Sequence, residues 1–165
     1  MTTRILLDSR KFRVEAVEVP DREGRTRTRE VVRHPGAVVI LPLLPDGRVL
    51  LIRNRRFAVN ATLYELPAGT REPGEADDVG ALRELEEETG YQAATLSPLV
   101  RFFASPGFCD EEMIGFVASD LTPARSAWTP PSTSRSSPWT SPRSARCCVT
   151  GASWTGRRWP VDSTG

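Results

Sequence analysis

Four glutamates crowd the C-terminal half of a helix predicted over residues 76–89. Glu84, Glu87 and Glu88 lie three or four positions apart, so their carboxylates share one helix face. Like charges at these spacings repel by about 0.2–0.5 kcal/mol per pair, and Arg83 can offset only part of this repulsion. A divalent cation would offset far more. Carboxylate oxygens favour Mg²⁺, Mn²⁺ or Ca²⁺, although a solvated acidic helix face explains the same charges.

The residues around this helix distinguish the two interpretations. Gly69 is followed after five residues by Glu75, and after seven more by the run 83–91, which reads RELEEETGY. This pattern resembles the Nudix box, G-x5-E-x7-R-E-U-x-E-E-x-G-U, at every fixed position, with the bulkier Tyr91 in the last apolar slot. The resemblance implies an enzyme that hydrolyses a nucleoside diphosphate linked to another group X.

Two flanking segments extend the similarity to about residues 10–121. Residues 65–69, ELPAG, resemble the entry segment of ADP-ribose pyrophosphatases, and residues 105–107, SPG, resemble a segment after their box. The resemblance implies Mg²⁺-dependent hydrolysis of ADP-ribose or a related nucleoside diphosphate sugar, giving AMP and a sugar phosphate. Other NDP-X compounds or dinucleotides stay open as substrates. A nucleotide-binding module without turnover, or an inactive product, stays open as well.

The family pattern also assigns roles to individual residues. Arg83 would orient the glutamates and Glu75 would buttress the box, while one further catalytic glutamate should follow residue 121, where this sequence has none. Arg53, Arg55, Phe57, Phe108, Glu111 and Glu112 are weaker candidates for the site. The metal ligands for Mg²⁺, or Mn²⁺, would be Ala68 through its carbonyl, Glu84, Glu87 and Glu88. The substrate-binding residues would be Arg56, Glu65, Pro106 and Gly107.

These residues need elements to position them, and the hydrophobic pattern predicts an α+β fold. The resemblance makes this a Nudix α/β/α sandwich with a mixed sheet and an N-terminal antiparallel hairpin. Val79, Leu82 and Leu85 form the predicted core stripe of the helix. We expect a loop at 54–64 and a strand-end position for His34. The predicted strands are 12–19 paired with 27–33, the apolar run 37–44 paired with 49–53, then 97–104 and 112–119.

Composition divides the chain into unlike parts. Residues 1–123 hold 16 basic and 20 acidic residues, whereas residues 124–165 hold six arginines, one aspartate and all four tryptophans. The second part lacks Leu, Ile, Phe, Met and Tyr. We hypothesise a frameshifted tail, because a shifted frame turns each Trp-Thr pair into Leu, Met or Val followed by Asp. A natural disordered Ser/Pro/Arg-rich tail fits the same composition.

The resulting domain prediction has three parts, with the family's last strand and helix missing or disordered. The parts are a hairpin region at 1–34 that in the family helps form a homodimer, a Nudix domain at 35–123, and the aberrant tail at 124–165. A net charge of +1 argues against nucleic-acid and membrane partners. Three cysteines make no disulfide framework, and the N-terminus lacks a secretory pattern, so we expect a cytoplasmic enzyme.

Overall fold

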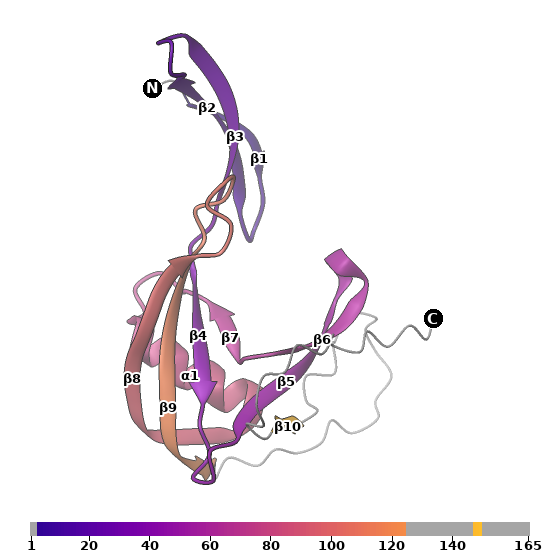
Figure 1. Ribbon diagram of the computed structural model, residues 1–165, viewed down its shortest axis with the longest axis vertical. Coiled ribbons are helices and arrows are strands. Elements are labelled where there is room, and N and C mark those ends of the chain that lie inside the picture. Colours follow the sequence, from indigo (N-terminus) through magenta and orange to yellow (C-terminus); the bar gives the residue numbers. More distant parts are fainter. Residues whose placement is uncertain (1–2, 125–146, 150–165) are drawn as a thin grey trace.

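The computed structural model describes residues 3–124 and 147–149 (Figure 1). Within these ranges the chain forms ten strands, one α-helix and one short 3-10 helix, so the predicted α+β class is confirmed. The helices are α1 (Asp77–Thr89) and η1 (Phe57–Val59). The strands are β1 (Thr3–Asp8), β2 (Arg13–Pro20), β3 (Thr26–Arg33), β4 (Ala37–Pro42), β5 (Val49–Arg56), β6 (Ala61–Glu65), β7 (Ala68–Thr70), β8 (Tyr91–Phe103), β9 (Glu112–Pro123) and β10 (Cys147–Val149).

A four-stranded mixed sheet forms the centre of the domain, in the order β7-β4-β9-β8. The pair β4–β9 is parallel and the other two pairs are antiparallel. Helix α1 packs against this sheet, and Ile40 and Leu85 are fully buried between them. The central place of β4 explains its nearly continuous apolar run, because four of its six residues are buried and little of the strand meets water.

Helix α1 begins and ends where the sequence predicts, but it buries a different face. Gly90 adopts φ 69° and its N–H donates to the carbonyl of Glu86, which ends the helix at the predicted glycine. The predicted stripe is confirmed for Leu85 but was wrong for Val79, which is 55% exposed, and for Leu82, which is 38% exposed. Ala81 and Leu85, spaced i, i+4, are the fully buried apolar residues. The small residue Ala81 lets the helix approach the sheet closely.

The predicted pairing of 37–44 with 49–53 was also wrong, since only an isolated bridge joins Leu43 to Val49. Strand β5 instead continues through the predicted loop to Arg56 and pairs with β6, with η1 between them. Asn60, in a left-handed conformation with φ 50°, makes the turn. Polar residues dominate the far end of β5, so the hydrophobic pattern does not predict a strand there. The hairpin β5–β6 projects away from the four-stranded sheet (Figure 1).

The N-terminal residues form a separate three-stranded sheet in the order β1-β2-β3. The predicted hairpin is confirmed as β2–β3, and β1 adds a strand that the sequence analysis missed. This sheet stands away from the rest of the domain and joins it at the end of β3 (Figure 1). There the N–H of Val32 donates to the carbonyl of Phe108 at 2.8 Å, and Arg33 pairs with Asp110 at 3.0 Å. His34 follows the strand end, as predicted.

The predicted tail lies outside the described residues, apart from Ala124 and β10. Strand β10 pairs antiparallel with the first residues of β5, Val49–Leu51. The prediction of a disordered tail, and of a missing last strand and helix, therefore stays a prediction for the remaining residues. Within the described part of the chain, no helix combines the length and apolar character that a membrane crossing requires.

Candidate active site

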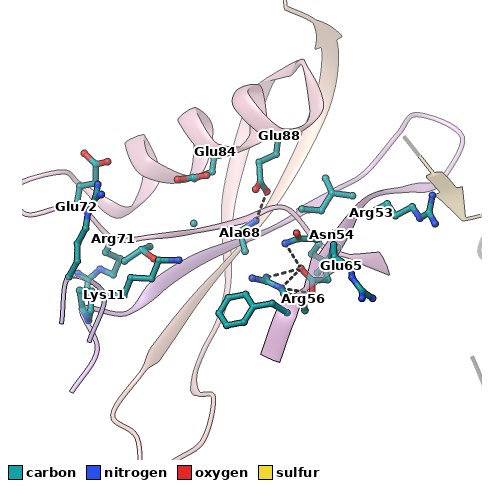
Figure 2. Close-up of a pocket in the computed structure, with 18 of the residues that line it drawn as sticks. Lys11, Arg53, Asn54, Arg56, Glu65, Ala68, Arg71, Glu72, Glu84 and Glu88 are labelled. Carbon is teal, nitrogen blue, oxygen red and sulfur yellow. Dashed lines mark hydrogen bonds and ion pairs between the residues drawn. The ribbon is translucent and has the colours of Figure 1, made fainter. Parts of the chain in front are cut away.

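The glutamates of α1 do not share one environment. Glu84 is only 8% exposed, whereas the side chain of Glu87 is 54% exposed. Glu88 is half-buried, and Figure 2 shows it beside Glu84 above β7. The i, i+4 spacing places Glu84 and Glu88 on the same side as the buried residues Ala81 and Leu85. The helix therefore directs two of its glutamates, rather than three, toward β7.

Strand β7 receives Glu84 at a residue without a side chain. A Cβ built on Gly69 would lie 2.0 Å from both the carboxyl carbon and Oε1 of Glu84. No side chain larger than glycine fits there unless Glu84 moves. The glycine that opens the sequence motif thus creates the space for the carboxylate fifteen positions later.

Ala68 holds the second carboxylate through its backbone. Its N–H donates to Oε2 of Glu88 at 3.0 Å. Ala68 lies opposite Val39 of β4, but β7 is an edge strand, and this N–H faces the free edge. In an antiparallel strand the carbonyl of a residue points to the same side as its N–H, so the Ala68 carbonyl also faces that edge. Two carboxylates and one carbonyl therefore converge there.

Arg83 connects the loop before the helix to these glutamates. Its Nε and Nη2 donate to the two carboxylate oxygens of Glu75 at 3.0 and 2.9 Å, and its Nη1 donates to Oε1 of Glu84 at 2.8 Å. Oε2 of Glu87 lies 3.6 Å from the same Nη1. The hydrogen bond from Arg83 lowers the pKa of Glu75, and the hydrogen bonds to Glu75 and then Glu84 raise the pKa of Arg83. Arg83 stays charged and holds Glu84 against Gly69.

The hairpin β5–β6 supplies a second polar cluster opposite the helix. Arg56 donates from Nε to Oε1 of Glu65 at 2.8 Å and from Nη2 to Oε2 at 2.7 Å, and Asn54 donates to the same Oε2 at 3.2 Å. The hydrogen bonds to Glu65 raise the pKa of Arg56. This cluster and the pair Glu84–Glu88 line one pocket of about 950 Å³ (Figure 2). Such a volume accommodates a nucleotide-sized ligand.

The pocket contains some of the predicted site residues and not others. Arg53, Arg55 and Phe57 line it beside Arg56, whereas its described lining does not include Glu87, Pro106 or Gly107. The last two lie in the β8–β9 loop, where Phe108 contacts β3. Sequence reasoning missed several lining residues, and Arg71 and four further polar residues are among them. The four are Arg10, Lys11, Asn54 and Glu72. Only nearness to Arg56 could have pointed to Asn54, and no spacing rule connects the first two residues to the helix.

The residues present fit a hard divalent cation. Among the described residues, no group of three or more His, Cys, Asp or Glu side chains is gathered in a preformed metal cage. The donors that do converge are oxygens, from Glu84, Glu88 and the carbonyl of Ala68. Mg²⁺ is commonly bound in this way, through one or two carboxylates plus the phosphates of the substrate, rather than by an all-protein cage.

Comparison with known proteins agrees with this geometry. A family-wide sequence model of the NUDIX domain matches residues 32–154. An ADP-ribose pyrophosphatase of Bacillus subtilis (strain 168) is 44% identical over 109 residues, covering 66% of this chain and 58% of that protein. A methanol dehydrogenase activator of Bacillus methanolicus is 41% identical over 117 residues, covering 71% and 62%.

A similar structure is also known. The crystal structure of an ADP compounds hydrolase superimposes with a TM-score of 0.68 at 27% identity, covering 90% of this chain and 75% of that one. The chain spans less than two thirds of the length of the two sequence relatives. The family match covers most of the chain and contains the whole pocket-forming helix and β7. The chain therefore belongs to the NUDIX domain family.

Proposed function

We propose that the chain is a Nudix pyrophosphohydrolase that converts ADP-ribose, or a related nucleoside diphosphate sugar, into AMP and a sugar phosphate. One observation carries the proposal: a single pocket has Glu84 and Glu88 on one wall and the Arg56–Glu65 pair on the other. Such a pocket offers oxygen donors for a cation and a guanidinium for a phosphate. The names of the Bacillus subtilis relative and of the similar crystal structure favour an ADP compound as substrate.

Nudix hydrolases use a divalent metal, and we propose Mg²⁺, or Mn²⁺, for this chain. Glu84, Glu88 and the Ala68 carbonyl would hold it, with the more exposed Glu87 as a further ligand at the rim. When bound, such a cation polarises the phosphoryl group and lowers the pKa of an attacking water. Arg83 fixes the direction of the Glu84 carboxylate before substrate arrives, since its Nη1 already donates to Oε1. This arrangement limits the reorganisation that the site must undergo.

On the opposite wall, Arg56 would bind a substrate phosphate. Its Nε and Nη2 donate to Glu65, which leaves Nη1 for a phosphate oxygen. Glu65 is an acceptor for a ribose hydroxyl or for an adenine amino group. The hydrogen bonds from Asn54 and Arg56 fix the position of this carboxylate. Pro106 and Gly107 keep a substrate-binding role in the proposal only through their resemblance to the family segment.

We propose a cytoplasmic homodimer as the working form. The apolar residues Ile5, Leu6 and Leu7 of β1 are exposed in the single chain, which supports an association through the N-terminal sheet. A small-molecule nucleotide is the proposed partner of the pocket. The composition, with three cysteines and no disulfide framework, supports the proposed cytoplasmic location.

A panel of substrates tests the proposed function. The purified full chain with Mg²⁺ should release AMP from ADP-ribose with a kcat/KM at least about tenfold above that for a dinucleotide. The reason is that ADP-ribose places a single sugar at the X end of the substrate, whereas a dinucleotide places a whole second nucleoside there. Chromatography identifies the products, and EDTA should stop the reaction until excess Mg²⁺ is added. Faster cleavage of a dinucleotide would favour the second substrate class. Binding of ADP-ribose without any release of AMP would contradict the enzyme and favour a binding module.

A further inference from the structure

Two cations that the proposed mechanism does not use lie at the tip of the β1–β2 turn. Arg10 and Lys11 occupy the centre of this turn, and their neighbours Ser9 and Phe12 close it. The N–H of Ser9 donates to the carbonyl of Phe12 at 3.1 Å, and the hydroxyl of Ser9 bonds both the carbonyl and the N–H of Phe12 at 2.6 and 3.2 Å. Three hydrogen bonds therefore fix the backbone that carries the two cations.

The register of the N-terminal sheet brings this turn to the catalytic part of the domain. Arg13, the first residue of β2, pairs with Arg33, the last residue of β3. Arg33 is anchored to Asp110 of the β8–β9 loop, so the β1–β2 turn lies at the end of the sheet that joins the domain. The β2–β3 turn lies at the opposite end, about 23 Å away, given seven residue steps at about 3.3 Å each.

Both cations line the same pocket as Glu84 and Glu88. Figure 2 shows Lys11 at the end of the pocket near Arg71 and Glu72, across from Arg56 and Glu65. Arg71 is paired with Asp77 at 2.7 Å, and Glu72 lies 4.0 Å from Arg83. Among the described residues, neither Arg10 nor Lys11 has an ion pair or a side-chain hydrogen bond. This end of the pocket therefore presents two cations that pair with no other residue in the part of the chain that the structure describes.

We propose that Arg10 and Lys11 form a second phosphate-binding site of the pocket. They would hold a phosphate group at the end of the substrate opposite the group held by Arg56. The inference rests on the proposed function for its substrate, and it deepens that function. The guanidinium and the ammonium repel each other because the fixed turn holds them side by side. A phosphate bound between them removes that repulsion and adds charge-assisted hydrogen bonds. The preferred substrates would thus be nucleoside diphosphate compounds with an additional phosphate at that end.

The composition allows a selective chemical test, because Lys11 is the sole lysine of the chain. Pyridoxal phosphate and pyridoxal both form imines with lysine amines, and borohydride fixes the label, but only the former carries a phosphate. We expect pyridoxal phosphate to label Lys11 at least about tenfold faster, as one charge-assisted contact implies. Inorganic pyrophosphate should protect Lys11. Peptide mass spectrometry separates this label from that on the N-terminal amine.

Equal labelling by the two aldehydes, or no protection by pyrophosphate, would overturn the phosphate site. The labelling of Lys11 needs no turnover, so we expect the same labelling and the same protection in Glu88→Gln. If pyrophosphate protects Lys11 but ADP-ribose is never cleaved, the proposed function fails and the binding site stands. If ADP-ribose is cleaved but Lys11 is not protected, the proposed function stands and the phosphate-binding site fails.

A matched pair of charge reversals gives the kinetic counterpart. Lys11→Glu and Arg22→Glu each change an exposed turn residue of the same sheet, but Arg22 lies in the distant β2–β3 turn. For a nucleoside diphosphate sugar that carries the additional phosphate, we expect Lys11→Glu to raise the KM about tenfold at similar kcat, and Lys11→Arg to restore it. Arg22→Glu should behave as wild type. Equal effects of the two reversals would show a general charge effect and would contradict a local phosphate site.

Discussion

At the scale of single residues, the site depends on where one carboxylate is allowed to lie. Glu84 is buried against β7, and burial of a charge is costly unless a partner stabilises it. Arg83 is that partner, and Gly69 provides the space. Two distant fixed positions of the sequence motif thus meet across one contact. A change at Gly69 should therefore act on chemistry more than on folding.

Gly69→Ala tests this contact. The added methyl group would displace the Glu84 carboxylate, and a misplacement of about 1 Å costs about 100-fold in rate. We expect a kcat lower by about that factor for ADP-ribose, with a thermal midpoint close to wild type. Gly47→Ala is the opposite control, for which we expect an unchanged kcat and a lower thermal midpoint. Its Cβ meets nothing within 4 Å, but its φ of 81° strains alanine by about 1 kcal/mol. An unchanged kcat in Gly69→Ala would refute the role of the contact.

At the scale of elements, α1 supplies both the core and the site from one face. Ala81 and Leu85 pack into the sheet, and Glu84 and Glu88 follow them at the edge of the same face. Rotating the helix to bury Val79 and Leu82 would turn both glutamates away from β7. The packing of Leu85 therefore fixes the direction of the carboxylates as well as contributing to stability.

Leu85→Ala and Val79→Ala separate the two faces of the helix. Leu85 is fully buried, so its truncation should lower the free energy of unfolding by about 2–4 kcal/mol. Val79 is mostly exposed, and its truncation should change that free energy by less than about 0.5 kcal/mol. Urea titrations followed by circular dichroism measure both values. Similar losses in the two variants would show that the helix buries the face predicted from the sequence.

The limits of the sequence prediction are clearest in these elements. Local signals located α1, since the acidic first turn and the terminal Gly90 act on residues that are close to them in the sequence. The buried face was not predictable in this way, because Val79 and Leu82 have the right size and spacing but the sheet meets Ala81 instead. The partners of β4 and β5 also depend on distant strands. Pairing β4 with β9 in parallel requires the whole segment between them to cross over.

At the scale of the whole molecule, the pocket combines segments that the sequence keeps far apart. The motif brought Ala68, Glu84 and Glu88 to one place because a strand and a helix follow each other directly. Lys11 reaches the same pocket only through the register of the N-terminal sheet and its anchor at Asp110. No pattern of residue types encodes that approach. This is why half of the pocket could be predicted and the opposite end could not.

The rate of ADP-ribose hydrolysis in Glu88→Gln tests the central claim most directly. The wild-type chain, Glu88→Gln and Glu86→Gln are compared at saturating Mg²⁺, with AMP release as the readout. Glu86 is a matched control on the same helix, since it accepts a hydrogen bond from Gln92 and does not line the pocket. We predict that Glu88→Gln loses at least about 100-fold in kcat while Glu86→Gln keeps the wild-type rate. Wild-type turnover by a folded Glu88→Gln protein would contradict the account.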